Sequence, residues 1–198
     1  MNRCRRALLA ALFTILPLAA CGTEKGPEKP PLADARIGGA FALTDQDGRA
    51  VRDSDFAGKY RLIYFGYTFC PDVCPVDLQA IGRGYAALEK SDPAKAAKLQ
   101  PIFVTTDPER DTPAVLKQYV AAFHPRLIGL TGTPAQIAEV AKRYGVFYSK
   151  RVEEGSSDYL VDHSRVALLF GPDGKPIAII PHDGKPDAIA AELSRWIT

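Results

Sequence analysis

The chain has 198 residues, of which 46% are hydrophobic and 24% charged, a composition typical of a globular domain with a sizeable core. Its formal net charge of +2 comes from Arg3, Arg5 and Arg6, because the first stretch of the chain contains no acidic side chain. The remainder is close to neutral and has no basic cluster interleaved with aromatic residues, so we expect no nucleic-acid binding.

Residues 1–21 have the pattern of an export signal. The three arginines are followed by an apolar stretch from Ala7 to Ala20, which is shorter than a membrane-spanning helix needs. The stretch ends in Leu18-Ala19-Ala20-Cys21-Gly22, which resembles the bacterial lipoprotein signal, in which the cysteine is acylated and becomes the new N-terminus. We therefore expect a lipid anchor at Cys21, and the alternatives are a plain signal peptide or an uncleaved anchor.

Residues 22–34 are expected to form a tether. They contain Gly26 and three prolines among charged residues, and they have no apolar periodicity. The folded domain would then span residues 35–198, held off a membrane surface. Because an exported domain meets oxidising conditions, its isolated cysteine pair can be oxidised unless other proteins keep it reduced.

The first elements of the domain are predicted to be a hairpin and a strand. Asp47-Gly48 separates the short alternating runs 41–44 and 49–51, which is typical of a β-hairpin. A calcium loop is a weak alternative, because the twelve-residue ligand pattern does not follow. Residues 61–65 then read as a buried strand that leads into a loop with two cysteines.

The loop 66–75 carries the candidate chemistry, because Cys70 and Cys74 lie between this strand and a helical pattern. Pro71 and Pro75 disfavour the α conformation for the residue before each of them, so we expect a tight loop with Cys74 at the helix N-cap. The positive end of a helix favours thiolates, which predicts lowered pKa values for these thiols. Two such thiolates could close on a soft metal ion or on each other.

Other uses of the cysteine pair stay open at this point. It could be a structural disulfide or two buried, inert thiols. Zinc is less favoured, since it needs about four ligands and the other cysteines, Cys4 and Cys21, lie near the N-terminus. A thiol–disulfide oxidoreductase usually has a C-x-x-C spacing and a proline where this chain has His163. A peroxidase is weaker still, because no separate peroxidatic cysteine with a partner threonine is visible.

Strands and helices alternate through the rest of the chain. We expect helices at about 75–88, 94–99, 113–123, 134–144 and 186–196, and strands at 102–105, 127–130, 166–170 and 176–180. Residues 145–148 are expected to be extended and residues 150–158 to form a surface loop. This order predicts an α/β fold with a central mixed β-sheet, helices on both faces and an N-terminal β-hairpin. The cysteine loop would follow the C-terminal end of a parallel strand, where such folds place their sites.

Three histidines could supply a further ligand. His163 stands in Asp162-His163-Ser164, just before the last hairpin, where the chain of a thioredoxin-like arrangement faces the cysteine loop. A lone histidine is more often structural, so its position alone leaves the role open. His124 at a helix end and His182 in a turn are expected to be solvated. The only methionine, Met1, leaves with the signal, so we expect no thioether ligand.

Three aspartates are candidates for a supporting role around the site. Asp107 and Asp111 follow the strand next to the cysteine strand, and they could orient a ligand or only cap the following helix. Asp162, or a nearby backbone carbonyl, could hold the second ring nitrogen of His163 and fix its tautomer.

Three motifs in the same order resemble the Sco/SenC family of copper-binding, thioredoxin-like proteins over about residues 35–198. They are Gly66-Tyr67-Thr68-Phe69-Cys70-Pro71-Asp72-Val73-Cys74-Pro75, Thr106-Asp107-Pro108-Glu109-Arg110-Asp111-Thr112-Pro113 and Asp162-His163-Ser164. The resemblance implies a thioredoxin-like fold, with a copper ion bound by Cys70, Cys74 and His163. The chemistry agrees, because two thiolates suit Cu(I) and an added imidazole also allows Cu(II).

By the same resemblance, the chain would be a copper chaperone that assists assembly of the dinuclear copper centre of cytochrome c oxidase. Its partners would be subunit II of the oxidase and other copper or thiol-redox proteins of the periplasm. The alternative is a thiol–disulfide oxidoreductase that keeps the oxidase cysteines reduced, so whether the protein is an enzyme stays open. Family members usually carry a membrane-spanning anchor. Here the signal at Cys21 would instead tether the domain to a bacterial membrane, in the periplasm or cell-envelope space.

Overall fold

The computed structural model describes residues 29–152 and 158–198, so the predicted signal, with Cys21, lies outside the described residues. The strands are β1 (Ala42–Asp45), β2 (Ala50–Arg52), β3 (Tyr60–Gly66), β4 (Leu99–Thr105), β5 (Ile128–Thr131), β6 (Tyr148–Val152), β7 (Tyr159–His163), β8 (Ala167–Phe170) and β9 (Pro176–Ile180). The helices are η1 (Asp53–Phe56, a short 3-10 helix), α1 (Val73–Ser91), α2 (Pro93–Lys98), α3 (Pro113–Ala121), α4 (Pro134–Arg143) and α5 (Pro186–Trp196).

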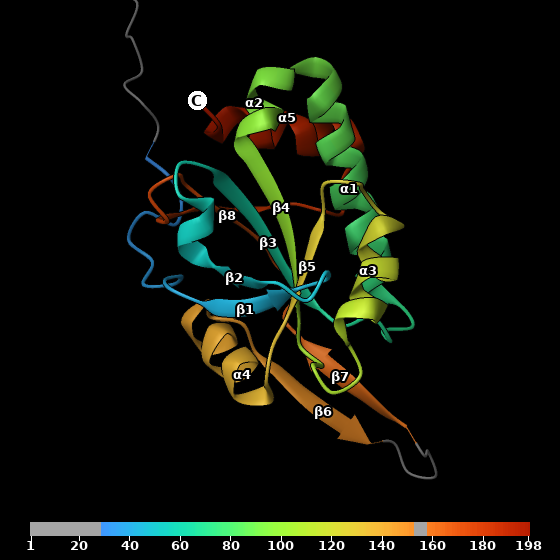
Figure 1. Cartoon of the computed structure of the whole chain (residues 1–198). Coiled ribbons are helices and arrows are strands. Elements are labelled where there is room, and N and C mark those ends of the chain that lie inside the picture. Colours follow the sequence, from blue (N-terminus) through green and yellow to red (C-terminus); the bar gives the residue numbers. More distant parts are fainter. Residues whose placement is uncertain (1–28, 153–157) are drawn as a thin grey trace, which may run out of the picture.

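A seven-stranded mixed sheet in the order β2-β1-β5-β4-β3-β8-β9 forms the centre of the molecule (Figure 1). The strands β3, β4 and β5 run parallel to one another, whereas β8 pairs antiparallel with β3 and β1 pairs antiparallel with β5. Every residue of β3 is buried, as expected for a strand that is covered on both faces. The cysteine loop follows directly from the C-terminal end of this strand.

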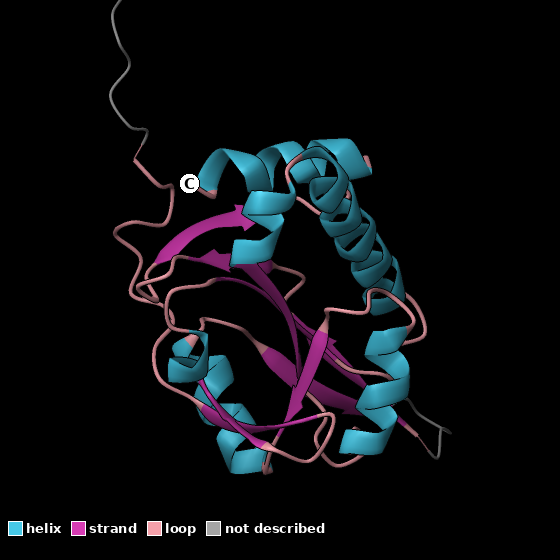
Figure 2. Ribbon diagram, turned by 45° about the horizontal axis from the view of Figure 1, so that its top comes forward, coloured by secondary structure: helices cyan, strands magenta, loops and turns pink. Residues whose placement is uncertain are grey.

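Helices cover both faces of the sheet (Figure 2). On one face Leu62 and Tyr64 of β3 pack into a core with α1, α3 and α5. On the other face the alternate residues Ile63 and Phe65 pack into a second core with η1 and α4. The predicted α/β fold, with its mixed sheet, helices on both faces and N-terminal β-hairpin, is therefore confirmed.

The predicted surface loop over residues 150–158 is partly wrong. Residues 148–152 form β6, which pairs antiparallel with β7 in a separate two-stranded sheet, so that Tyr148 lies opposite His163. Four of the five residues of β6 are exposed, so the strand has none of the alternating burial that a sequence pattern could indicate. This two-stranded sheet projects from the main sheet at the bottom of Figure 1 and carries His163 at its inner end.

Two histidines that we expected to be solvated are not. His124 is 8% exposed, and its Nε2 lies 3.1 Å from Glu89 Oε2. His182 has a side chain that is only 11% exposed and lies against Asp77. Both residues follow an apolar element closely, so the chain leaves the core too late for the ring to reach solvent.

The described part of the predicted tether contacts the domain. The backbone N–H of Leu32 donates to the carbonyl of Ile177 at 2.9 Å, and the Leu32 side chain packs against the second core. Among the described residues, no helix combines the length and the apolar character that crossing a bilayer requires.

Candidate metal centre

The two cysteines occupy adjacent but different environments. Cys70 lies on the loop between β3 and α1 and is partly exposed, whereas Cys74 is in the first turn of α1 and is fully buried. The N–H of Cys74 points to the Cys70 sulfur at 3.5 Å. Helix α1 begins at Val73, two residues earlier than expected, so the prediction that Cys74 is the N-cap was wrong and Asp72 has that position.

The end of β3 approaches the buried thiol closely. A Cβ at Gly66 would lie 2.8 Å from Cys74 Sγ and 3.1 Å from the rings of Phe103 and Tyr64. Such a contact is too short to be tolerated, so only glycine lets strand and helix come together at this point. The glycine in the first motif thus has a packing reason of its own.

His163 at the end of β7 completes a cluster of three side chains that could hold a metal ion. Its Nε2 lies 3.0 Å from Cys74 Sγ, although the two residues are 89 positions apart in the chain. One ligand atom from each of Cys70, Cys74 and His163 lies within 4.8 Å of the other two. Two thiols and an imidazole at these distances form a donor set that fits a soft or borderline transition metal.

A contact of the second ring nitrogen of His163 fixes the orientation and the tautomer of the imidazole. Nδ1 lies 3.2 Å from the backbone carbonyl of Ser164. Because a carbonyl can only accept, Nδ1 carries the proton, and Nε2 turns its lone pair toward Cys74. The rings of Tyr64 and Tyr67 pack edge-on against the imidazole, with centroids 6.2 and 6.0 Å away, and limit its rotation.

The two thiols differ in acidity. The neighbouring Cys74 thiol lowers the pKa of Cys70 to about 3, with smaller contributions from His163 and from the backbone N–H groups of Cys74 and Asp72. The interaction with Cys70, together with burial, raises the pKa of Cys74 above its ordinary value. The prediction of lowered pKa values for both thiols is therefore wrong for Cys74, because the neighbouring Cys70 and the burial of its side chain both raise the pKa of this thiol.

This asymmetry predicts a single thiolate in the reduced protein at neutral pH. We expect the ultraviolet absorbance of the thiolate to correspond to one sulfur between about pH 5 and pH 8, and alkylation to occur at Cys70. The depressed pKa of Cys70 means that this absorbance is lost only as the pH falls toward its folded-state value. Two thiols that both ionise near their ordinary pKa would contradict this expectation.

Asp111 holds the start of the cysteine loop. Its carboxylate is fully buried and accepts hydrogen bonds from the Thr68 N–H at 3.0 Å, the Thr68 hydroxyl at 2.6 Å and the Thr105 hydroxyl at 2.6 Å. Burial raises the pKa of Asp111 despite these three donors. The residue therefore lies where a supporting role requires it, one loop away from the thiols.

Asp107 and Asp162 have other partners. Asp107 accepts a hydrogen bond from the Tyr159 hydroxyl at 2.7 Å and pairs with Arg110, whose guanidinium lies 3.8 Å from the centre of the Tyr159 ring. Asp107 thus ties the beginning of β7 to the loop before α3. Asp162 is half exposed and lies 3.5 Å from Arg151, whereas the Ser164 carbonyl is the group that lies on the His163 Nδ1.

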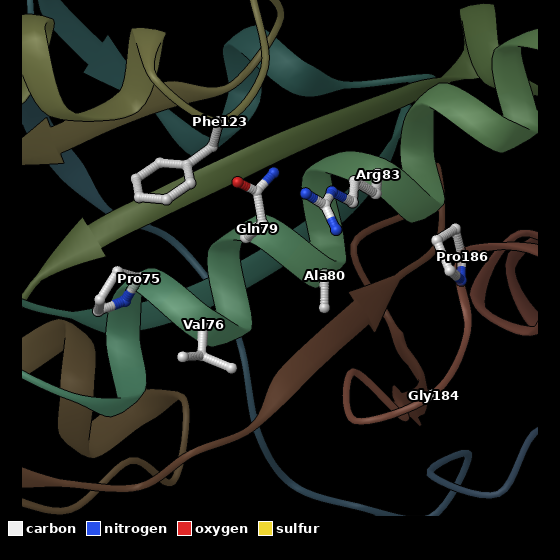
Figure 3. A pocket seen from close by; sticks show the side chains of 8 residues that line it. All are labelled: Pro75, Val76, Gln79, Ala80, Arg83, Phe123, Gly184 and Pro186. Carbon is white, nitrogen blue, oxygen red and sulfur yellow. The ribbon is translucent and has the colours of Figure 1, made fainter.

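The outward side of α1 lines a separate hollow of about 470 Å³ beside the cysteine loop. Pro75, Val76 and Ala80 face it from α1, with Phe123 and Pro186 across from them (Figure 3). None of Cys70, Cys74 and His163 lines this hollow. The hollow thus marks the outward side of the first turns of α1, and the buried thiol of Cys74 lies on the opposite, inward side.

Sequence reasoning missed a buried polar group next to the cluster. Asp77, on the inner side of α1, contacts Tyr64, Arg165 and His182. A signal was present in the sequence, because an acid at this position interrupts the apolar face formed by Leu78 and the residues that follow it along α1.

Comparisons with known proteins agree with the resemblance. The model of the family described as SCO1/SenC matches residues 29–198. The chain is 45% identical over 146 residues to Protein SCO1 homolog 1, mitochondrial, of Arabidopsis thaliana, covering 74% of this chain and 42% of the relative. It is 46% identical over 144 residues to Protein SCO2 homolog, mitochondrial, of Bos taurus, covering 72% and 53%. The chain thus spans about half the length of these relatives.

Solved structures resemble the whole described domain. Bradyrhizobium japonicum ScoI with copper bound has a TM-score of 0.73 and 44% identity, covering 81% of this chain and 99% of that one. BsSco, described as a member of the Sco family of cytochrome c oxidase assembly proteins with a disulfide switch, has a TM-score of 0.64 and 26% identity, covering 84% and 95%. The predicted thioredoxin-like fold is confirmed by these neighbours.

Proposed function

Because the chain belongs to the SCO1/SenC family, we propose that it binds copper and assists assembly of the copper centre of cytochrome c oxidase. Cys70, Cys74 and His163 are the proposed ligands. One observation carries the proposal: these three side chains, from a loop, a helix and a distant strand, place their ligand atoms within 4.8 Å of one another. The copper-bound ScoI structure, which is 44% identical, supports the choice of metal.

The donor set suits a metal that is passed on. Two sulfurs satisfy Cu(I), and the imidazole adds the nitrogen that Cu(II) prefers. Cys70 is partly exposed beside a cavity of about 350 Å³ that is also lined by Arg151 and Asp162. A partner cysteine could reach the metal from this side, displace one ligand and take the ion. Subunit II of the oxidase and other copper or thiol-redox proteins are the proposed partners.

A second function, thiol–disulfide exchange with the cysteines of the oxidase, is favoured by the acidity of Cys70. A thiolate that is partly exposed and has a protonated thiol beside it is the arrangement of an attacking cysteine with its resolving partner. The attack would form a mixed disulfide with the target, and Cys74 would then release the target as a dithiol, leaving Cys70 and Cys74 oxidised. The two functions predict different effects of removing His163.

Anaerobic titration of the reduced domain, residues 29–198, tests the copper function directly. We expect one equivalent of Cu(I) to bind, because the chain offers a single dithiol, and one equivalent of Cu(II) to give a thiolate-to-copper absorption band. The measurement uses a competing Cu(I) chelator and visible absorption spectroscopy. A reduced, folded domain that takes no copper from the chelator and gives no band would end the proposal.

The arrangement of residues 1–28, which lie outside the described part of the chain, is also a proposal. We propose a lipoprotein signal over residues 1–21, a tether that follows it, and a lipid anchor at Cys21 that holds the domain at a bacterial membrane in the periplasm or cell-envelope space. Two acyl chains hold a protein at a membrane stably, whereas one chain does not.

Substitution of the acceptor cysteine tests this anchor. Cys21→Ser is expected to abolish acylation and lipoprotein-specific cleavage, so that the chain keeps its signal or is cleaved elsewhere. Mass spectrometry of the mature N-terminus and detergent partitioning measure both effects. Cys4→Ser is the matched control and is expected to change neither. An unmodified N-terminus in the wild-type protein would contradict the anchor.

A further inference from the structure

Asp77, a buried carboxylate one helical turn after Cys74, holds three side chains together. Asp77 is 2% exposed and accepts two hydrogen bonds from Arg165, from Nε at 3.0 Å and from Nη2 at 2.7 Å, each to a different oxygen. The Tyr64 hydroxyl donates to the same carboxylate at 2.7 Å, and His182 Nε2 lies 3.3 Å away. Both oxygens are therefore engaged, and the guanidinium binds them as a fork.

The two members of this ion pair sit next to different proposed ligands. Asp77 follows Cys74 by three residues, about one turn of α1, and is buried on the inner side of the helix, whereas its neighbours Val76 and Ala80 line the outer hollow. Arg165 follows His163 by two residues, in the segment between β7 and β8. The ion pair therefore joins the helix that carries the buried thiol to the segment that carries the imidazole.

Tyr64 contacts both the Asp77 carboxylate and the imidazole of His163. Tyr64 lies on β3, and its ring packs edge-on against His163 at 6.2 Å and His182 at 5.8 Å between centroids. Its hydroxyl donates to Asp77 while its ring contacts both imidazoles. The position of the imidazole is thus defined through the ring as well as through the chain.

Breaking the ion pair would leave the buried carboxylate of Asp77 without its main hydrogen-bond donor. A carboxylate that is this deeply buried needs its donors, because an unpaired buried charge is strongly unfavourable. Burial opposes ionisation, yet the hydrogen bonds from Arg165 and Tyr64 hold the pKa of Asp77 below its ordinary value. Arg165 is 48% exposed and would be hydrated if it were released. Because Asp77 needs its hydrogen-bond donors, its ion pair with Arg165 keeps the segment after His163 in place.

We propose that Asp77 and Arg165 form a positioning pair that sets the distance between Cys74 Sγ and His163 Nε2, now 3.0 Å. Neither residue touches the metal. The pair acts by fixing residues 163–165 against α1, so that the imidazole is already in place when copper arrives. In its copper readout, this inference rests on the proposed function. Its readout in copper-free protein does not.

Four variants test the pair. Arg165→Gln removes the fork, Arg165→Lys keeps the charge but cannot bind both oxygens in the same way, and Asp77→Asn removes the charge at the buried end. The double variant, which combines Asp77→Asn with Arg165→Gln, closes a thermodynamic cycle. Arg143→Gln is the matched control, because Arg143 also pairs with a carboxylate, Glu139 at 2.6 Å, but on α4, at the opposite face of the sheet.

The first measurement uses reduced protein without copper. NMR of the imidazole nitrogens reports whether His163 Nε2 still lies on the Cys74 thiol. We expect Arg165→Gln to shift the Nε2 resonance, while Arg143→Gln leaves it unchanged. Wild-type values in Arg165→Gln, with the fold intact by circular dichroism, would overturn the proposal whether or not the protein binds copper. This variant decides the question even if Asp77→Asn does not fold.

The second measurement adds copper. We expect Arg165→Gln to weaken Cu(II) binding by about 10–100-fold and to shift the thiolate-to-copper band, as loss of a group that orients a ligand does. Cu(I) should be affected much less, because both sulfurs remain. Arg165→Lys should recover only part of the loss, and the double variant should lose no more than the worse single one. Full recovery with lysine would show that the charge alone suffices, and additive losses would show that the two residues act independently; either result would overturn the positioning pair.

Discussion

Oxidation of Cys70 and Cys74 to a disulfide is expected to abolish Cu(I) binding, and reduction to restore one equivalent. The two sulfurs lie within 4.8 Å of each other, on either side of a short loop, so small movements bring them to bonding distance. Disulfide formation removes two electrons, which pass to an oxidant such as a partner disulfide, and one proton from Cys74, because Cys70 is already a thiolate. The product has no thiolate left to offer a metal.

The measurement compares copper uptake by the same protein in both states. Oxidised and reduced domain are titrated anaerobically with Cu(I) against a competing chelator, and free thiols are counted in parallel. Cys70→Ser and Cys74→Ser are the matched variants, since each should bind Cu(I) weakly whether or not a reductant is present. Equal binding by oxidised and reduced wild-type protein would exclude the cysteine pair as the site.

His163→Ala is expected to damage Cu(II) binding most. The imidazole supplies the nitrogen that Cu(II) prefers over a pair of sulfurs, and its Nε2 is already oriented by the Nδ1 contact with the Ser164 carbonyl. We expect a loss on the order of 10–100-fold in Cu(II) affinity and a lost or strongly shifted thiolate-to-copper band. Cu(I) should weaken less, because Cys70 and Cys74 remain.

The same variant separates the two proposed functions. In a dithiol reductase without a metal role, His163→Ala would change the redox potential of the cysteine pair and leave whatever copper affinity exists untouched. His124→Ala is the matched control, because it removes another buried imidazole, one that pairs with Glu89 far from the thiols. If His163→Ala binds Cu(I) and Cu(II) as the wild type does, with an unchanged spectrum, the oxidoreductase becomes the better account.

The parts of the fold that could be predicted are those with a local signal. The buried strands β3 and β4 read as continuous apolar runs, and both tight hairpins are marked by Asp-Gly, as at Asp47-Gly48. The pair β6–β7 had no such signal. Its stability comes from contacts with distant loops, such as the Tyr159 hydroxyl on Asp107, and these are invisible in a window of sequence.

The candidate site divides in the same way. The loop with Cys70 and Cys74 could be placed at the end of a parallel strand from proline positions and strand order alone. The position of His163 before the last hairpin indicated that it could face the thiols, but only the resemblance made it a ligand, because a lone histidine is more often structural. The opposite acidities of the two cysteines depend on burial, and the spacing of prolines could not indicate that the side chain of Cys74 points inward.

The long chain separation between the two halves of the cluster has a consequence for how the protein matures. An unfolded chain offers the local dithiol without the imidazole, because His163 is 89 residues away from Cys74 and meets it only when the end of β7 lies beside the cysteine loop. Cu(II) held by all three side chains can therefore exist only in a completed fold. Occupancy stabilises that fold by mass action, by about 2.7 kcal/mol when the metal exceeds its dissociation constant a hundredfold. The visible colour of the copper protein is thus also a signal that the polypeptide has finished folding.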